Sequence, residues 1–251
     1  MRFSVPLHKS RRHHILKSRT RSSYVTFLWF FGVLIILFSI SAAVSIQPLE
    51  FLSNLATSFL RTSVAYCFAL VLALALALLI TSTQILENTF LPIFDSLQSF
   101  PSFALFPLLT ETLQKSPESV IISVLVITMI WPILFTLISA MKNRRESLEE
   151  AATIFGATGV KRLTAFTLPQ LWPAIVTGSI VGWGEGWEFI IGAELLVNVQ
   201  HGIGQYFGHL GQDHQSTILA VGIVLLMLFL FEINKILWLP LLDQATHYES
   251  E

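Results

Sequence analysis

The sequence predicts an all-α protein that crosses a membrane with six helices. Hydrophobic residues make up 53% of the chain and charged residues only 12%, whereas soluble domains carry about 25% charged residues. Apolar runs long enough to bridge a bilayer, which takes about 20 residues each, use up nearly all of the 251 residues. These two observations exclude a soluble globular fold and predict a single membrane domain.

The six apolar runs follow one another with short polar connections. The predicted spans are 24–46, 62–81, 91–113, 120–141, 173–197 and 217–239. The first run is longer than the apolar core of a signal peptide, which has about 7–15 residues, so we predict an uncleaved helix. The third run contains Asp95, Pro101 and Pro107, and each proline removes a backbone hydrogen bond, so kinks are expected there.

Orientation follows from the positive charges, which gather on the cytoplasmic side of short loops. Residues 1–23 hold seven Lys and Arg residues and no acidic residue, and the loop between the fourth and fifth runs holds five more. With six spans, the two segments fall on the same side, so both termini are expected to be cytoplasmic in the plasma (inner) membrane. Only Arg61 and Lys115 remain for the outer loops. The basic tail at 1–23 is expected to bind anionic membrane lipid rather than nucleic acid.

The loop 142–172 carries the pattern of two short helices joined by a turn. Ser147 followed by Glu150 fits a capping box, and Gly156 is suited to the left-handed conformation that ends a helix. Thr158 is the expected cap of the second helix, and Pro169 marks the return to the membrane. The first of these helices carries an apolar stripe at helical spacing, which consists of Leu148, Ala151, Ala152 and Phe155. Such a stripe needs a partner on which to dock.

This loop resembles the signature of permease subunits of binding-protein-dependent ABC importers. The signature reads Glu-Ala-Ala, three residues, Gly, nine residues, an apolar residue, any residue and Leu-Pro, and every spacing fits Glu150 to Pro169. Phe166 stands where the family usually has a β-branched aliphatic residue. The resemblance implies the MetI-like ABC importer permease fold over residues 62–240. It also implies that the loop is a coupling helix for an ATPase, with that role carried by Glu150, Ala151, Ala152, Gly156, Leu168 and Pro169.

Three further places are similar to the permease branch for nitrate, sulfonate, taurine and similar small solutes. They are the proline-rich segment with Pro101, Ala104 and Pro107-Leu108, the pair Ala193-Glu194, and Gly202-Ile203-Gly204. The segment 111–117 departs from the branch, which usually has a Phe-Gly turn there. Glu185 and Glu188 are also unusual for it, so the solute is less firmly indicated than the transport machinery.

The resemblance implies a transport subunit rather than an enzyme, with no cofactor. No Gly-x-x-x-x-Gly-Lys-Ser/Thr phosphate loop occurs in the sequence, so ATP is expected to be handled by a separate ATP-binding subunit. The other implied partners are an external solute-binding protein and a second permease copy in a homodimer. His209, Asp213 and His214 lack a fourth ligand at a familiar spacing, so no metal site is expected.

Two glutamates in the fifth run stand out because ionisable groups inside a membrane are costly and face a cavity or a partner. Gly178, Gly182 and Gly186 recur every fourth residue and predict close helix packing, and Glu185 and Glu188 are expected on the same broad face. No Lys or Arg lies deep in a predicted span. The glutamates are therefore either protonated within the bundle or line a wet pathway, and with Glu194 they are the candidates for the translocation pathway.

Two other functions remain open for the same glutamates. Glu185 and Glu188 could act as an acid–base pair in an intramembrane enzyme, or carry protons in a secondary transporter. The enzyme would not need the loop from Glu150 to Pro169. The secondary transporter would work without ATP and stop when the proton gradient collapses.

Overall fold

The computed structural model describes residues 32, 39, 47–113, 116–143, 150 and 154–250. Within this part every regular element is helical and none is a strand. The elements, in chain order, are α2 (Pro48–Ile80), α3 (Gln84–Gln98), the 3₁₀ helix η1 (Ser102–Leu105), α4 (Phe106–Thr112), α5 (Pro117–Lys142), α7 (Gly159–Arg162), the π-helix η2 (Leu163–Thr167), α8 (Leu168–Val197), α9 (Ile203–Gln212), α10 (Ser216–Ile233), the π-helix η3 (Asn234–Trp238) and α11 (Leu239–Ser250). The predicted tail 1–23 and nearly all of the predicted first helix lie outside the described residues.

The centre of the bundle is α5, which packs between α2 and α8. Small residues on both neighbours allow their backbones to approach the large side chains of α5 closely. On α2 the fully buried small residues recur every fourth position, at Ala65, Ala69, Ala73 and Ala77. The large, fully buried side chains of α5 include Ile121, Leu125, Met129, Ile133, Leu134 and Leu137.

The predicted packing role of the three glycines on α8 is confirmed. A Cβ atom at Gly178 would lie 3.0 Å from the Cα of Ile133, and one at Gly182 would lie 2.9 Å from the carbonyl oxygen of Met129. A Cβ at Gly186 would come within 2.8 Å of the Met129 side chain. Any larger residue at the first two positions would therefore push α8 away from the backbone of α5.

Three helical segments of the described part are long and apolar enough to cross a membrane. They are Pro48–Ile80, Pro117–Lys142 and Ser216–Thr246, so this part of the chain supports three of the six predicted spans. The prediction of one kinked helix over 91–113 is wrong. The chain there is divided into α3, η1 and α4, because Pro101 disfavours helical geometry in the residue before it and so stops α3.

Two helix boundaries also differ from the prediction. The second helix begins at Pro48 rather than near Thr62, so Arg61 lies within α2 and not in an outer loop as predicted. The last helix continues past Leu239 to Ser250. Pro240 has no N–H group to donate, but the π-helix η3 precedes it and its wider turns accommodate the missing hydrogen bond. The π-helix η2 precedes Pro169 in the same way.

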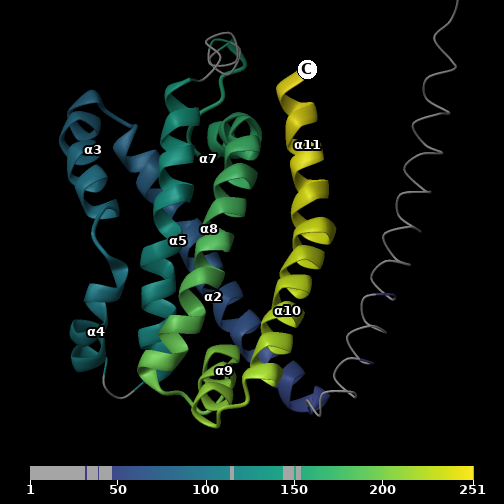
Figure 1. The fold of residues 1–251 in the computed structure, drawn as a ribbon. Helices are drawn as coiled ribbons and strands as arrows, with labels where there is room; N and C mark the ends of the chain where they lie inside the picture. Colours follow the sequence, from purple (N-terminus) through teal and green to yellow (C-terminus); the bar gives the residue numbers. More distant parts are fainter. Residues whose placement is uncertain are drawn as a thin grey trace, which may run out of the picture.

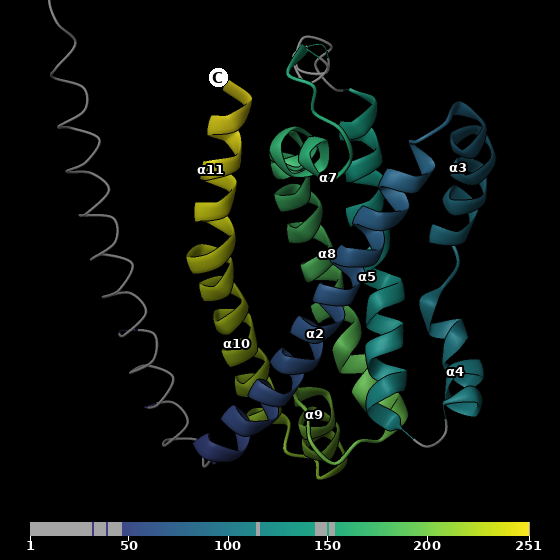
Figure 2. The ribbon, with the colours of Figure 1, turned by 180° about the vertical axis from the view of Figure 1, so that it is seen from behind.

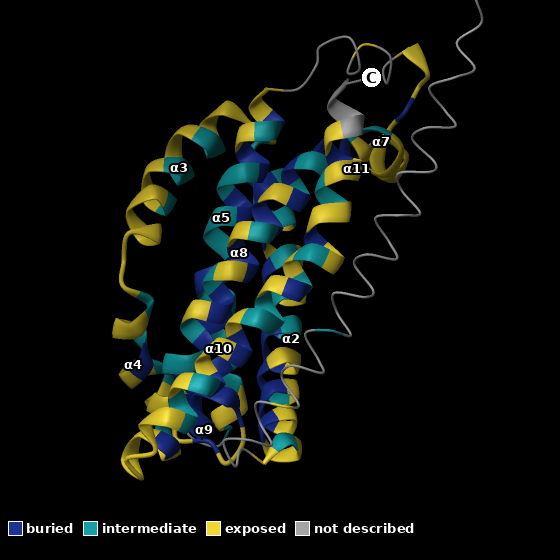
Figure 3. Ribbon diagram, turned by 45° about the vertical axis from the view of Figure 1, so that its right-hand side comes forward, coloured by how far each residue is buried: buried dark blue, intermediate teal, exposed yellow. Residues whose placement is uncertain are grey.

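The bundle has two different ends, which we call the α7 end and the α9 end. The α7 end carries the segment around α7 together with the C-terminus, and the α9 end carries α9 and the first turns of α2 and α5 (Figures 1 and 2). Helix α3 packs on the side of the bundle without burying any residue (Figure 3). At the α7 end, Lys142 of α5 forms an ion pair of 2.6 Å with Glu87 of α3.

Candidate functional site

The loop at the α7 end exposes large apolar side chains. Ile154 is 81% exposed, Phe155 is 72% exposed and Val160 is 75% exposed. Gly156 has the predicted left-handed conformation, with a φ angle of 62°. Glu150 is helical and exposed, whereas Ala151 and Ala152 lie outside the described residues. Apolar side chains exposed to this degree on one short segment are typical of a surface that contacts another protein or the membrane.

The second half of the loop runs without interruption into the membrane helix. Segments α7, η2 and α8 follow one another directly from Gly159 to Val197. Leu168 is half-buried and Pro169 is exposed in the first turn of α8. Thr158 is the N-cap residue of α7, as predicted, and has an extended backbone, although its hydroxyl makes no capping hydrogen bond.

Glu185 and Glu188 lie in the middle of α8, but Glu188 does not share a face with the glycines. The three glycines are buried against α5, whereas Glu188 is exposed and Glu185 is half-buried. The prediction of one common face is therefore wrong for Glu188. In the described part of the chain, no hydrogen bond or ion pair reaches either carboxylate.

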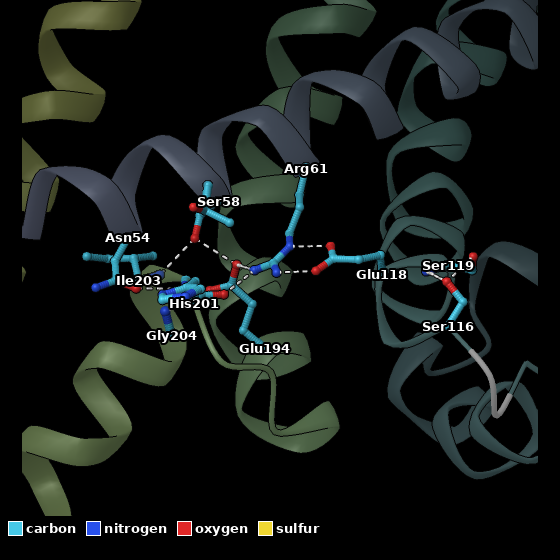
Figure 4. Close-up of polar contacts among 12 residues, drawn as sticks. Asn54, Ser58, Arg61, Ser116, Glu118, Ser119, Glu194, His201, Ile203 and Gly204 are labelled. Atoms are coloured by element: carbon cyan, nitrogen blue, oxygen red, sulfur yellow. Dashed lines mark hydrogen bonds and ion pairs between the residues drawn. The ribbon is translucent and has the colours of Figure 1, made fainter. Parts of the chain in front are cut away.

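Glu194 has a different environment near the end of α8, where it meets Arg61 of α2. Arg61 Nη1 lies 2.7 Å from Glu194 Oε1, and the Glu194 side chain is completely buried. The same Nη1 donates to the carbonyl oxygen of His201 at 2.6 Å, and the opposite edge of the guanidinium binds Glu118 (Figure 4). Arg61 thus ties α2 to the first turn of α5 and the last turns of α8.

Glu194 also holds the beginning of α9. Its Oε2 accepts the backbone N–H of Gly204 at 2.8 Å, and its Oε1 accepts the hydroxyl of Ser58 at 2.7 Å. The Ser58 oxygen in turn accepts the N–H of Ile203 at 2.8 Å. The first N–H groups of a helix have no partner within the helix, so these side chains cap α9 from α2 and α8 (Figure 4).

The Gly202-Ile203-Gly204 segment fits this cluster only because it contains glycine. Gly202 has a φ angle of 144°, and its N–H donates to Asn54 Oδ1 at 2.8 Å. A Cβ atom there would overlap the Glu194 carboxylate, and one at Gly204 would overlap the backbone of Ile191. The cluster of Asn54, Ser58, Arg61, Glu118 and Glu194 with this segment is called the α9-end cluster below.

The sequence pointed to Glu194 and to Gly202-Ile203-Gly204, but it missed the α2 side of the α9-end cluster. Asn54, Ser58 and Arg61 have the spacing of one helix face. Hydropathy does not reveal this helix face, because it predicts a loop before Thr62. Both carboxylate oxygens of Glu194 are bonded within the chain, so Glu194 anchors the beginning of α9 in this conformation.

A second buried glutamate, Glu232 of α10, contrasts with Glu194. It is 4% exposed, and neither of its carboxyl oxygens has a hydrogen-bond partner in the described part of the chain. The indole nitrogens of Trp187 and Trp238 are likewise buried without an acceptor there. Both indoles belong to an aromatic cluster between α2, α8 and α10, in which Phe229 stacks edge-on against Trp187 with ring centroids 5.8 Å apart.

Comparison with known proteins agrees with the resemblance drawn from the loop. A family model described as "Binding-protein-dependent transport system inner membrane component" matches residues 69–237. The nitrate import permease protein NrtB of Synechocystis sp. is 29% identical over 140 residues, 56% of this chain and 50% of the relative. The bicarbonate transport system permease protein CmpB of the same organism is 27% identical over 163 residues, 64% of this chain and 58% of the relative.

A third relative is the taurine transport system permease protein TauC of Escherichia coli, which is 22% identical over 178 residues, 71% of this chain and 64% of the relative. The chain spans about half the length of the nitrate permeases that it matches. The family match includes Glu118 and Glu194 but begins after Arg61.

Proposed function

The chain belongs to the family of binding-protein-dependent transport system inner membrane components, and from this we propose that it is the permease subunit of an ATP-driven importer. The supporting observation is the exposed loop at the α7 end, which is continuous with the long helix α8. Binding of an ATPase to Phe155 and its neighbours would act on α8 through the turn at Gly156 and then through α7 and η2, which run into α8 without a break. Hydrolysis in the partner would then change the access of the membrane pathway.

Under this proposal the assembly contains a second permease copy, ATP-binding subunits and an external solute-binding protein. The α7 end and both termini face the cytoplasm, and the α9 end faces outward. The solute is a small molecule of the nitrate, sulfonate or taurine class, in keeping with the names of the relatives. The chain itself performs no catalysis, needs no cofactor and meets the ATPase through Glu150, Ala151, Ala152, Gly156, Leu168 and Pro169.

The coupling role is tested at Gly156, whose left-handed backbone disfavours a β-branched side chain although a Cβ would meet no neighbour there. We expect Gly156→Val to lose ATP-dependent uptake in proteoliposomes that contain the complete transporter, while the membrane bundle stays folded. Gly156→Asn is the matched control, because asparagine tolerates this conformation. Equal uptake by wild type, Gly156→Val and Gly156→Asn would exclude the loop as the coupling element.

Charge reversal at Glu150 tests the contact face separately from the backbone. Glu150 is exposed, so Glu150→Lys should leave the melting temperature of the isolated chain unchanged. We expect the variant to bind the ATP-binding subunit less tightly and to uncouple its ATPase activity from uptake. Normal copurification and normal uptake would show that Glu150 does not contact the ATPase.

The pathway role of Glu185 and Glu188 rests on their position in α8 and on the lack of a partner among the described residues. Glutamine keeps the size of each side chain but removes its charge. We expect at least one of Glu185→Gln and Glu188→Gln to assemble normally and change the uptake rate or the solute preference. If both variants transport nitrate, bicarbonate and taurine as the wild type does at every pH tested, the glutamates have no role in the pathway.

A further inference from the structure

We propose that the Nε and Nη2 edge of Arg61 is a binding site for a small oxyanion, and that Glu118 occupies it when no anion is present. The oxyanion has two oxygens on one edge, as nitrate, bicarbonate and carboxylates do. This inference rests on the proposed transport function and specifies the chemistry of the solute at the α9 end. It assigns Arg61 a binding role in addition to its role in packing.

The geometry of the Arg61–Glu118 contact is that of a bound oxyanion. Arg61 Nε donates to Glu118 Oε2 at 2.6 Å, and Nη2 donates to Oε1 at 2.5 Å (Figure 4). Two parallel hydrogen bonds from a planar guanidinium match the two oxygens of a carboxylate. Nitrate and bicarbonate present the same pair of oxygens, so the Glu118 carboxylate has the shape and charge of the ligand that we propose.

The two glutamates that bind Arg61 differ in how easily they can leave it. The side chain of Glu194 is 0% exposed and that of Arg61 is 7% exposed, whereas the Glu118 side chain is 54% exposed. Solvent screens an ion pair that is open on one side, so the contact with Glu118 is held less firmly than the buried contact with Glu194. Glu118 can therefore exchange with an anion from solution, while Glu194 and the His201 carbonyl keep the guanidinium in place.

The displaced carboxylate also has a favourable place to go. Glu118 lies in the first turn of α5, where the helix dipole favours a negative charge in water. The cluster contains one guanidinium and two carboxylates, so an anion that replaces Glu118 leaves the charge next to Arg61 unchanged. The exchange thus avoids leaving a buried guanidinium with too few partners.

The test uses the purified full chain with glutamine in place of Glu118. This variant removes the tethered competitor, whose effective concentration is on the order of millimolar or higher. We expect sodium nitrate to raise the melting temperature of Glu118→Gln more than sodium chloride does at equal ionic strength. The half-saturating nitrate concentration should be at least about tenfold lower than in the wild type.

Two controls separate this site from general salt effects. Glu111→Gln removes an exposed carboxylate on the nearby helix α4 and should respond to nitrate as the wild type does. Arg61→Lys in the Glu118→Gln background keeps a charge beside Glu194 but has no planar fork, so the nitrate-specific response should disappear. If the double variant does not fold, Glu118→Gln and Glu111→Gln still decide the question.

The inference is wrong if nitrate and chloride act equally on Glu118→Gln, or if Glu111→Gln gains the same response. A response that persists in the folded double variant also excludes the Arg61 edge. Failure of the transport proposal is a separate result, seen as no ATP-dependent uptake by the wild-type transporter. Normal wild-type uptake without a nitrate-specific response in Glu118→Gln would remove only the oxyanion site.

Discussion

The two ends of the bundle are built in opposite ways. At the α9 end, Arg61, Glu194 and their neighbours are buried and joined by hydrogen bonds across α2, α5, α8 and α9. At the α7 end, Ile154 and Phe155 project from the chain and are 81% and 72% exposed. The polar side chains of the α9-end cluster are satisfied by contacts within one chain, whereas the apolar side chains of Ile154 and Phe155 are left exposed. Helix α8 connects the two ends, so under the proposed function a rigid clamp at the α9 end would turn a push at the α7 end into a tilt of the helix.

The largest effect should come from removing the cation of the α9-end cluster. Arg61→Ala leaves Glu194 buried without its ionic partner, and breaking a buried ion pair in this way costs about 3–5 kcal/mol. We expect a large drop in the melting temperature of the purified chain. Glu118→Gln removes the more exposed of the two carboxylates that bind this guanidinium, and it should cost only about 0–1 kcal/mol. Similar losses in the two variants would contradict the difference in burial.

The next effect concerns the glycine turn that enters α9. Gly202→Ala places a Cβ atom against the Glu194 carboxylate at a backbone φ of 144°, where side chains other than glycine are strained. Overpacking of this kind costs about 1–3 kcal/mol. The control is Gly211→Ala, because a Cβ at Gly211 meets nothing within 4 Å. Thermal unfolding of the two variants should therefore differ, and equal stability would show that the turn can relax.

The α7 end should respond in the opposite manner. Phe155→Ser removes an exposed apolar side chain that contributes little packing within the chain, so stability should change by less than about 0.5 kcal/mol. Under the proposed function, the same variant should lose affinity for the ATP-binding subunit. Copurification measures the affinity, and a melting curve of the isolated chain measures stability. A strongly destabilised Phe155→Ser would mean that this end is also packed by its own chain.

The difference between the ends also explains what the sequence could predict. The loop at the α7 end is a local feature, so its spacing alone identified the turn at Gly156, and the family match agrees with it. The glycine stripe on α8 was likewise readable from its period of four. The α9-end cluster depends on contacts such as Ser58 with Glu194, which are 136 positions apart in the chain. No local pattern specifies such pairs.

Helix boundaries limited the prediction for a related reason. Hydropathy marks the apolar part of a helix, but α2 continues through the polar residues between Pro48 and Arg61. Those polar residues are helical because their partners lie on α8 and α9, which a hydropathy profile does not contain. The break between α3 and α4 shows the reverse, since hydropathy predicts one span over 91–113 while proline interrupts the helix.

The sharpest contrast within the core concerns the two buried glutamates. Glu194 is bonded to Ser58, Arg61 and Gly204, whereas Glu232 has no partner within the described residues. Removing a partnered group leaves the partners unsatisfied, but replacing an unpartnered polar group by an apolar one of similar shape is neutral or stabilising. We therefore expect Glu232→Met to change stability by less than about 1 kcal/mol or to raise it, and Glu194→Met to lower it by several times that amount.

Melting temperatures of the two methionine variants, measured in the same detergent, decide this comparison. Methionine matches glutamate in length and fills the space of the side chain without its charge, so cavity formation contributes little to either result. If Glu232→Met is as unstable as Glu194→Met, Glu232 has a partner beyond the described residues and is a second anchor. If Glu232→Met is stable but its uptake falls, the carboxyl group acts in transport, and the aromatic cluster around Trp187 is where its contacts should be sought.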